Sequence, residues 1–150
     1  MIFSLKINQI LLKALNLAKE LGHKNYCGLH VLDALMIKDV VVFNILNKFG
    51  VDTGFVFNKL KYSGNKFRMS QVNTYKSPSF KKALEVAQDY AKNYGIKEIE
   101  PIHILHGILN MPKDNIVIET LLHFAPLKYY CQEIFLHMIK PSFKNQVTIE

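Results

Sequence analysis

The sequence predicts an all-α domain of two four-helix repeats, about eight helices in all, related by a pseudo-twofold axis and joined by a linker. Apolar residues recur at steps of three and four, the spacing of helices with one buried face. Glycine and proline separate these segments at helical lengths, and the second half of the chain repeats the first. At 150 residues and 49% hydrophobic composition, the chain is expected to form a single domain over residues 1–150.

Repeat one is expected over about residues 8–62. Its four helices are expected at 8–21, 29–37, 40–48 and 52–62. Gly22 offers the left-handed conformation that closes many helices, and Asp52 is a favourable N-cap. The β-branched run that starts at Val40 would also suit a strand, but the length of the apolar segment favours a helix.

A polar segment without helical periodicity, about 63–76, is expected to link the two repeats. Repeat two is expected over about residues 77–140. Its helices are expected at 78–94, 101–109, 116–124 and 126–139. Ser77 and Pro78 make a favourable helix start, because proline loses no hydrogen bond at the first helical position. Pro141 is expected to end the last helix.

Shifting the sequence against itself by 73 positions aligns identical residues in the same order. The pairs that we expect in the structural core of the repeat are Ala18 with Ala91, Gly22 with Gly95, His30 with His103, and Leu32 with Leu105. One repeat alone could not bury its apolar face, so the two copies are expected to share a core. The groove between the copies is then the natural place for a partner to bind.

Composition and motifs argue against several functional classes. The formal charge is +7, but the lysines are spread along the chain, which does not favour a basic nucleic-acid-binding domain. The apolar runs are shorter than the ~20 residues of a membrane span. Cys27 and Cys131 are expected to be buried or half-buried free thiols, since no zinc or nucleophile motif surrounds them. We therefore expect no catalytic residues, no metal, no cofactor and no membrane association.

The stretches Ala14–His23 and His30–Leu35 resemble the amino-terminal repeat domain of the Clp AAA+ unfoldases, the ClpA, ClpB and ClpC group. The second copy carries the same likeness in Ser77–Leu84 and Pro101–Leu109. The resemblance covers roughly residues 8–140. In that family the domain consists of two four-helix repeats in front of the ATPase rings, where it docks adaptors and substrates.

The resemblance implies a protein-binding module that docks adaptors or substrates for a Clp-type unfoldase or protease, without catalysis of its own. The chain has no phosphate-binding loop of the Walker type, so it is not expected to hydrolyse nucleotide. Its ATPase ring would belong either to the same full-length chain or to a separate protein. The expected location is the cytoplasm, or the stroma of an organelle. One alternative is a free-standing accessory protein that stabilises a Clp protease complex, and another is a basic helical nucleic-acid-binding domain.

The sequence departs from the family where its members carry Gly-Thr-Glu-His at the start of the second helix of each repeat. In ClpC-type domains, that threonine and glutamate help to bind phosphorylated arginine. Here Leu29 and Ile102 occupy the glutamate positions and cannot pair with a guanidinium group. We therefore predict no phosphoarginine binding. Leu29 and Ile102, with the repeat-related lysines Lys24 and Lys97, are instead candidate partner-binding residues. If Leu29 and Ile102 are exposed, they favour an apolar peptide or helix, and the alternative is that both are simply buried.

Overall fold

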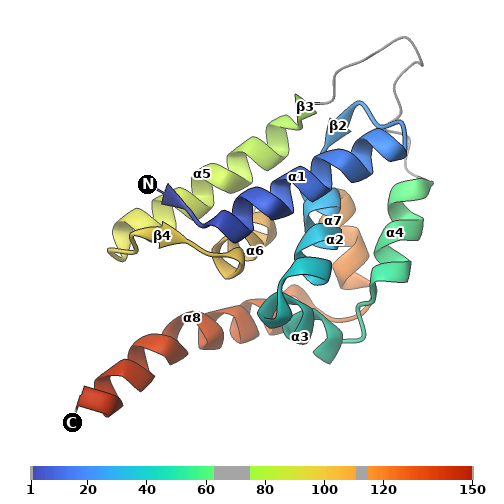
Figure 1. Ribbon diagram of the computed structural model, residues 1–150. Helices are drawn as coiled ribbons and strands as arrows, with labels where there is room; N and C mark the ends of the chain where they lie inside the picture. Colours follow the sequence, from blue (N-terminus) through green and yellow to red (C-terminus); the bar gives the residue numbers. More distant parts are fainter. Residues whose placement is uncertain (1, 63–74, 111–114, 150) are drawn as a thin grey trace.

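The computed structural model describes residues 2–62, 75–110 and 115–149, which contain eight helices and four two-residue strands (Figure 1). Repeat one comprises α1 (Leu5–Glu20), α2 (Gly28–Lys38), α3 (Val40–Lys48) and α4 (Thr53–Lys61). Repeat two comprises α5 (Pro78–Asn93), α6 (Pro101–Leu109), α7 (Asn115–Leu122) and α8 (Leu127–Ile149). The predicted all-α class with two four-helix repeats is confirmed. Most of the expected linker lies outside the described residues.

Short parallel strands, which the sequence did not predict, tie each repeat to the other. They are β1 (Ile2–Phe3), β2 (Asn25–Tyr26), β3 (Tyr75–Lys76) and β4 (Glu98–Ile99). β1 pairs with β4, and β3 pairs with β2. The first strand of each repeat therefore pairs with the second strand of the other repeat. The Ser4 amide extends the first pair by donating to the Ile99 carbonyl at 3.1 Å, and the Ser77 amide extends the second by donating to the Tyr26 carbonyl at 3.0 Å. A shift of 73 residues converts one pair into the other.

The same shift relates the helix ends. Ser4 and Ser77 cap α1 and α5, since each hydroxyl accepts a backbone N–H three residues on. Gly22 and Gly95 end these helices with φ of 70° and 67°, conformations that cost glycine little. The predicted helix stops at both glycines are confirmed, although these two residues lie in turns and contribute no side chain to the core.

The core is centred on α2 and α6. α2 packs against α1, α3 and α4 of its own repeat and against α5, α6 and α7 of the other. Nine of its 11 residues are buried, which is typical of a helix covered on all sides. The predicted core residues Ala18, Leu32, Ala91 and Leu105 are fully buried. The two repeats therefore share one core.

His30 and His103 close the first turns of these central helices. The Cys27 amide donates to His30 Nδ1, and the Glu100 amide donates to His103 Nδ1, each at 2.9 Å. His30 Nε2 also lies 2.7 Å from His23 Nδ1. Burial, together with His23, lowers the pKa of His30 to about 3, and burial lowers that of His103, with His106 adding to the effect. Both imidazoles are therefore neutral acceptors that hold the backbone in place.

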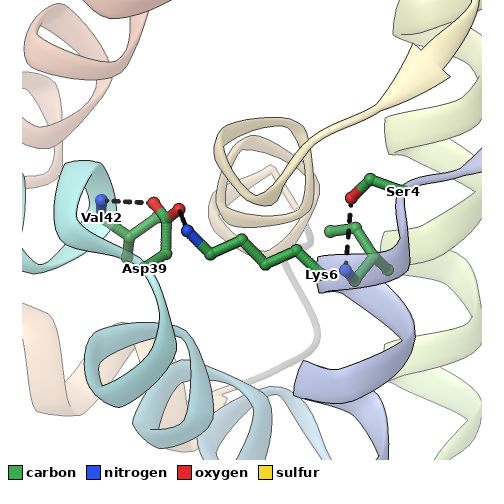
Figure 2. Close-up of polar contacts among 5 residues, drawn as sticks. Ser4, Lys6, Asp39 and Val42 are labelled. Atoms are coloured by element: carbon green, nitrogen blue, oxygen red, sulfur yellow. Dashed lines mark hydrogen bonds and ion pairs between the residues drawn. The ribbon is translucent and has the colours of Figure 1, made fainter.

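Two ion pairs fasten α3. Lys6 of α1 lies 2.9 Å from the Asp39 carboxylate, whose other oxygen accepts the Val42 N–H at 2.9 Å and so caps α3 (Figure 2). Lys48 at the other end of α3 pairs with Glu133 of α8. Because α3 presents several apolar side chains to solvent, these polar contacts help to fix its position.

The last helix extends beyond its predicted end. α8 continues through Pro141 to Ile149 and reaches away from the rest of the domain in Figure 1. A proline inside a helix removes one hydrogen bond and tends to bend the helix, but here it does not end it. Among the described residues, no single helix combines the length and apolarity of a membrane span. α3 and α4 meet that combination only together, across a bend of 90°.

Gly107 sets the approach of α6 to α5. A Cβ at this position would lie 2.3 Å from the Ala83 carbonyl oxygen, so alanine must push the two helices apart. We expect Gly107→Ala to lower the free energy of unfolding by about 2–3 kcal/mol. The matched control is Ala34→Gly at the equivalent position of repeat one, where lost helix propensity and the loss of one buried methyl group predict about 1–2 kcal/mol. Urea unfolding of both variants measures the difference, and a Gly107→Ala variant as stable as wild type would contradict this packing.

Acid is expected to destabilise the fold through His30. Its pKa is about 3 in the folded protein and near 6.5 when unfolded, so below pH 6.5 the unfolded state binds more protons. The contribution of His30 to stability is present above pH 6.5 and is lost as the pH falls towards 3, by at most about 1.4 kcal/mol per pH unit.

His30→Asn isolates this effect, because groups outside the His30 contacts titrate alike in both proteins. Urea unfolding at about pH 7 and about pH 4.5 should show a larger loss of stability in the wild type than in the variant. Equal losses in the two proteins would refute the assignment.

Candidate functional site

The structure separates the four residues predicted to bind a partner. Leu29 is fully buried near the start of α2, so it cannot contact a partner on the folded domain, and we withdraw it as a binding residue. It is buried because α2 is covered by helices of both repeats. Ile102 is half-buried against the same core, whereas Lys24 and Lys97 are exposed in the turns after α1 and α5. These four residues therefore do not form one surface.

An apolar groove lies instead between α5, α6 and α8 of repeat two. Its volume is about 800 Å³. It is lined by Tyr90, Tyr94, Ile96, His106, Asn110, Cys131, Gln132, Phe135 and Met138. Cys131, Phe135 and Met138 follow one another at steps of four and three along α8, which puts them on one face of that helix. We refer to this hollow as the apolar groove.

Aromatic rings dominate the apolar groove. The ring centroid of Tyr90 lies 4.6 Å from that of Tyr94 and 4.7 Å from that of His106. Tyr94 is 71% exposed and Phe135 is 55% exposed, so both can contact a partner without rearrangement. Burial lowers the pKa of His106, while burial and Tyr94 raise that of Tyr90. The lining residues that the structure describes include no lysine, arginine, aspartate or glutamate, so at neutral pH this part of the groove is uncharged.

A second groove occupies the equivalent place in repeat one, between α1, α2 and α4. Its volume is about 610 Å³. It is lined by Gln9, Leu12, Lys13, Asn16, Leu17, Glu20, Asp33, Ile37, Lys38 and Phe57. The 73-residue shift converts Leu17 into Tyr90 and Asp33 into His106, so the two grooves lie at equivalent places, and the second one also carries charged side chains. We refer to this hollow as the polar groove.

A third hollow, smaller than the apolar and polar grooves, lies between the two repeats. A hollow of about 530 Å³ lies between α4 and α7, and its lining includes Phe55, Tyr62, Ile116 and the charged residues Lys59 and Glu119. The two larger hollows each lie within one repeat. That a partner binds between the two repeats stays a prediction.

Helical spacing in the sequence indicates only some of the residues that line the apolar groove. The period of α5 placed Tyr90 and Tyr94 on one face, but it could not show that this face stays partly open. The spacing of Cys131, Phe135 and Met138 was available as a signal, yet a buried stripe has the same spacing. Cys131 was predicted to be buried or half-buried and is exposed, whereas Cys27 is half-buried as predicted, and neither thiol forms a disulfide.

The described residues contain no group of three or more His, Cys, Asp or Glu side chains that could hold a metal ion. At the two positions where the resemblance implies a glutamate, this chain has buried Leu29 and half-buried Ile102, so no carboxylate is available at either.

Three solved structures illustrate the fold that this chain shares. One is described in preliminary structural investigations of a malarial protein secretion system, with 19% identity, a TM-score of 0.68, and coverage of 92% of this chain and 95% of that one. The N-terminal domain of the chaperone ClpD from Arabidopsis thaliana has 18% identity, a TM-score of 0.72, and coverage of 91% and 94%. The Hsp104 N-terminal domain from Candida albicans has 16% identity, a TM-score of 0.73, and 89% coverage of both chains.

No curated protein matches the sequence at a significant level. The family described as the Clp repeat (R) N-terminal domain matches residues 2–122. Both the match and the fold thus agree with the resemblance in Ala14–His23 and Pro101–Leu109. The chain belongs to the Clp repeat N-terminal domain family, whose domain is a module of the Clp and Hsp100 ATPases.

Proposed function

We propose that this chain docks adaptors or unfolded protein substrates for a Clp-type AAA+ unfoldase, and that the apolar groove is where apolar segments of these proteins bind. The observation that carries the proposal is the exposure of aromatic side chains in a groove whose described lining holds no lysine, arginine, aspartate or glutamate. Soluble domains rarely leave such groups open without a partner for them.

The shape and lining of the groove favour a short extended or helical segment. Its volume of about 800 Å³ is within the range of sites that hold a few side chains. Tyr94 and Phe135 offer rigid rings with few rotatable bonds, so ordering them on binding costs little conformational entropy. Asn110 and Gln132 supply amide groups that can pair with the backbone of a bound segment.

Net charge favours particular partners. The chain carries a formal charge of +7. A partner protein whose apolar segment is flanked by acidic residues should therefore associate with this chain faster than one without them. Segments of this kind are exposed in unfolded clients and on adaptor proteins. Binding them in front of an ATPase ring would raise their local concentration at the unfolding pore, whether the ring is part of the same chain or a separate protein.

A permanently unfolded client, reduced and carboxymethylated α-lactalbumin with a fluorescent label, tests this proposal with the purified chain. Tyr94→Ala and Phe135→Ala each remove one exposed ring of the groove. We expect each to weaken binding about tenfold, since a buried aromatic contact in an interface is often worth more than ~1 kcal/mol. Fluorescence anisotropy measures the affinities, and circular dichroism confirms that the variants fold.

Tyr62→Ala is the matched control, because Tyr62 is 79% exposed and lines the small hollow between the repeats. Its affinity should stay close to that of the wild type, and free phosphoarginine should not compete. Equal affinities for all three variants, or a loss confined to Tyr62→Ala, would rule out the apolar groove as the docking site.

A further inference from the structure

Asp33 is a buried carboxylate in a helix that is otherwise almost entirely apolar. It is 4% exposed, and it lies where α2 lines the polar groove. None of the hydrogen bonds or ion pairs among the described residues involves its side chain. Burial raises the pKa of Asp33 to about 6, although Lys13 partly opposes the shift. The Asp33 oxygens are not fully enclosed and face the polar groove, where Lys13 acts on their charge. A carboxylate this deeply placed without a hydrogen-bond donor still costs stability, so this residue needs an explanation.

The fold itself does not require an acid here. The equivalent position in repeat two is His106, which lies on α6 and lines the apolar groove between α5, α6 and α8. Repeat two therefore shows that the helix arrangement tolerates a different side chain. A carboxylate that weakens the fold without serving it is typical of a group kept for binding.

We propose that the polar groove binds a basic side chain of a partner protein, with the Asp33 carboxylate as its counter-ion. The carboxylate oxygens can accept hydrogen bonds from a guanidinium or ammonium group, and an arginine can do so with two parallel bonds. This site lies on the other repeat from the apolar groove, so the two can be tested separately.

The rest of the lining suits the stem of a long cationic side chain. Leu12, Ile37 and Phe57 are exposed around the groove and offer apolar surface to the methylene groups. The ring of Phe57 can also attract a cation. Lys13 and Lys38 would repel the ligand, but Glu20 offsets part of that repulsion, and Lys38 lies at an exposed position where water screens its charge. Within this lining, Asp33 is the most deeply buried charged residue.

Chemical-shift mapping of the ¹⁵N-labelled chain tests the proposal directly. The probe is acetyl-Ala-Arg-Ala-amide, and the control is the same peptide with citrulline, which has the shape of arginine without its charge. The arginine peptide should shift amide signals of α1, α2 and α4 around the polar groove, while those around the apolar groove stay in place. The citrulline peptide should bind at least about tenfold more weakly, as expected when a charge-assisted hydrogen bond is lost.

Asp33→Asn provides the second arm. It should weaken binding of the arginine peptide to the level of citrulline and should raise the midpoint of thermal unfolding at neutral pH, because the buried charge is gone. The comparison of the two peptides on the wild-type chain needs no variant and holds even if Asp33→Asn folds poorly. Equal binding of both peptides, no shifts at millimolar arginine peptide, or unchanged binding by a folded Asp33→Asn variant would each overturn the proposal.

Discussion

The exchange of strands between the repeats is the constraint on which the rest of the structure depends. β1 of the first repeat is completed by β4 of the second, and β3 of the second is completed by β2 of the first. Each strand leads directly into a capped helix, so the pairing also fixes where α1 and α5 begin. The central helices α2 and α6 then pack on helices of both repeats. Neither repeat could keep this arrangement without the other.

This shared frame leaves the outer helix of each repeat free to diverge. α4 and α8 each cover one side of a groove whose other walls come from the first two helices of the same repeat. Because the frame is the same, single residues decide what each groove can bind. His106 and Tyr90 give one groove its aromatic character, while Asp33 gives the other a buried acid and Leu17 replaces the ring of Tyr90. One fold thus presents two grooves of different chemistry.

The sequence predicted those parts of the fold that local physics determines. Gly22 and Gly95 marked helix ends because only glycine adopts their backbone conformation cheaply, and Ser77 with Pro78 marked a helix start. The strands are too short for any period to reveal them. Pro141 misled because a proline removes one helical hydrogen bond but can bend a helix without ending it. The burial of Leu29 and the positions of the grooves depend on how the helices pack against one another. Spacing along a helix cannot tell a covered face from one that is left open.

Hydrogen–deuterium exchange of the intact chain, with and without the unfolded client, is the most direct test of the central claim that the domain docks proteins through the apolar groove. The account predicts slower exchange in α5, α6 and α8 around Tyr94 and Phe135 when the client is bound, with α1 and α4 unchanged. Protection centred on the start of α2, or on the hollow between α4 and α7, would contradict it, as would no protection at all at a client concentration that saturates binding.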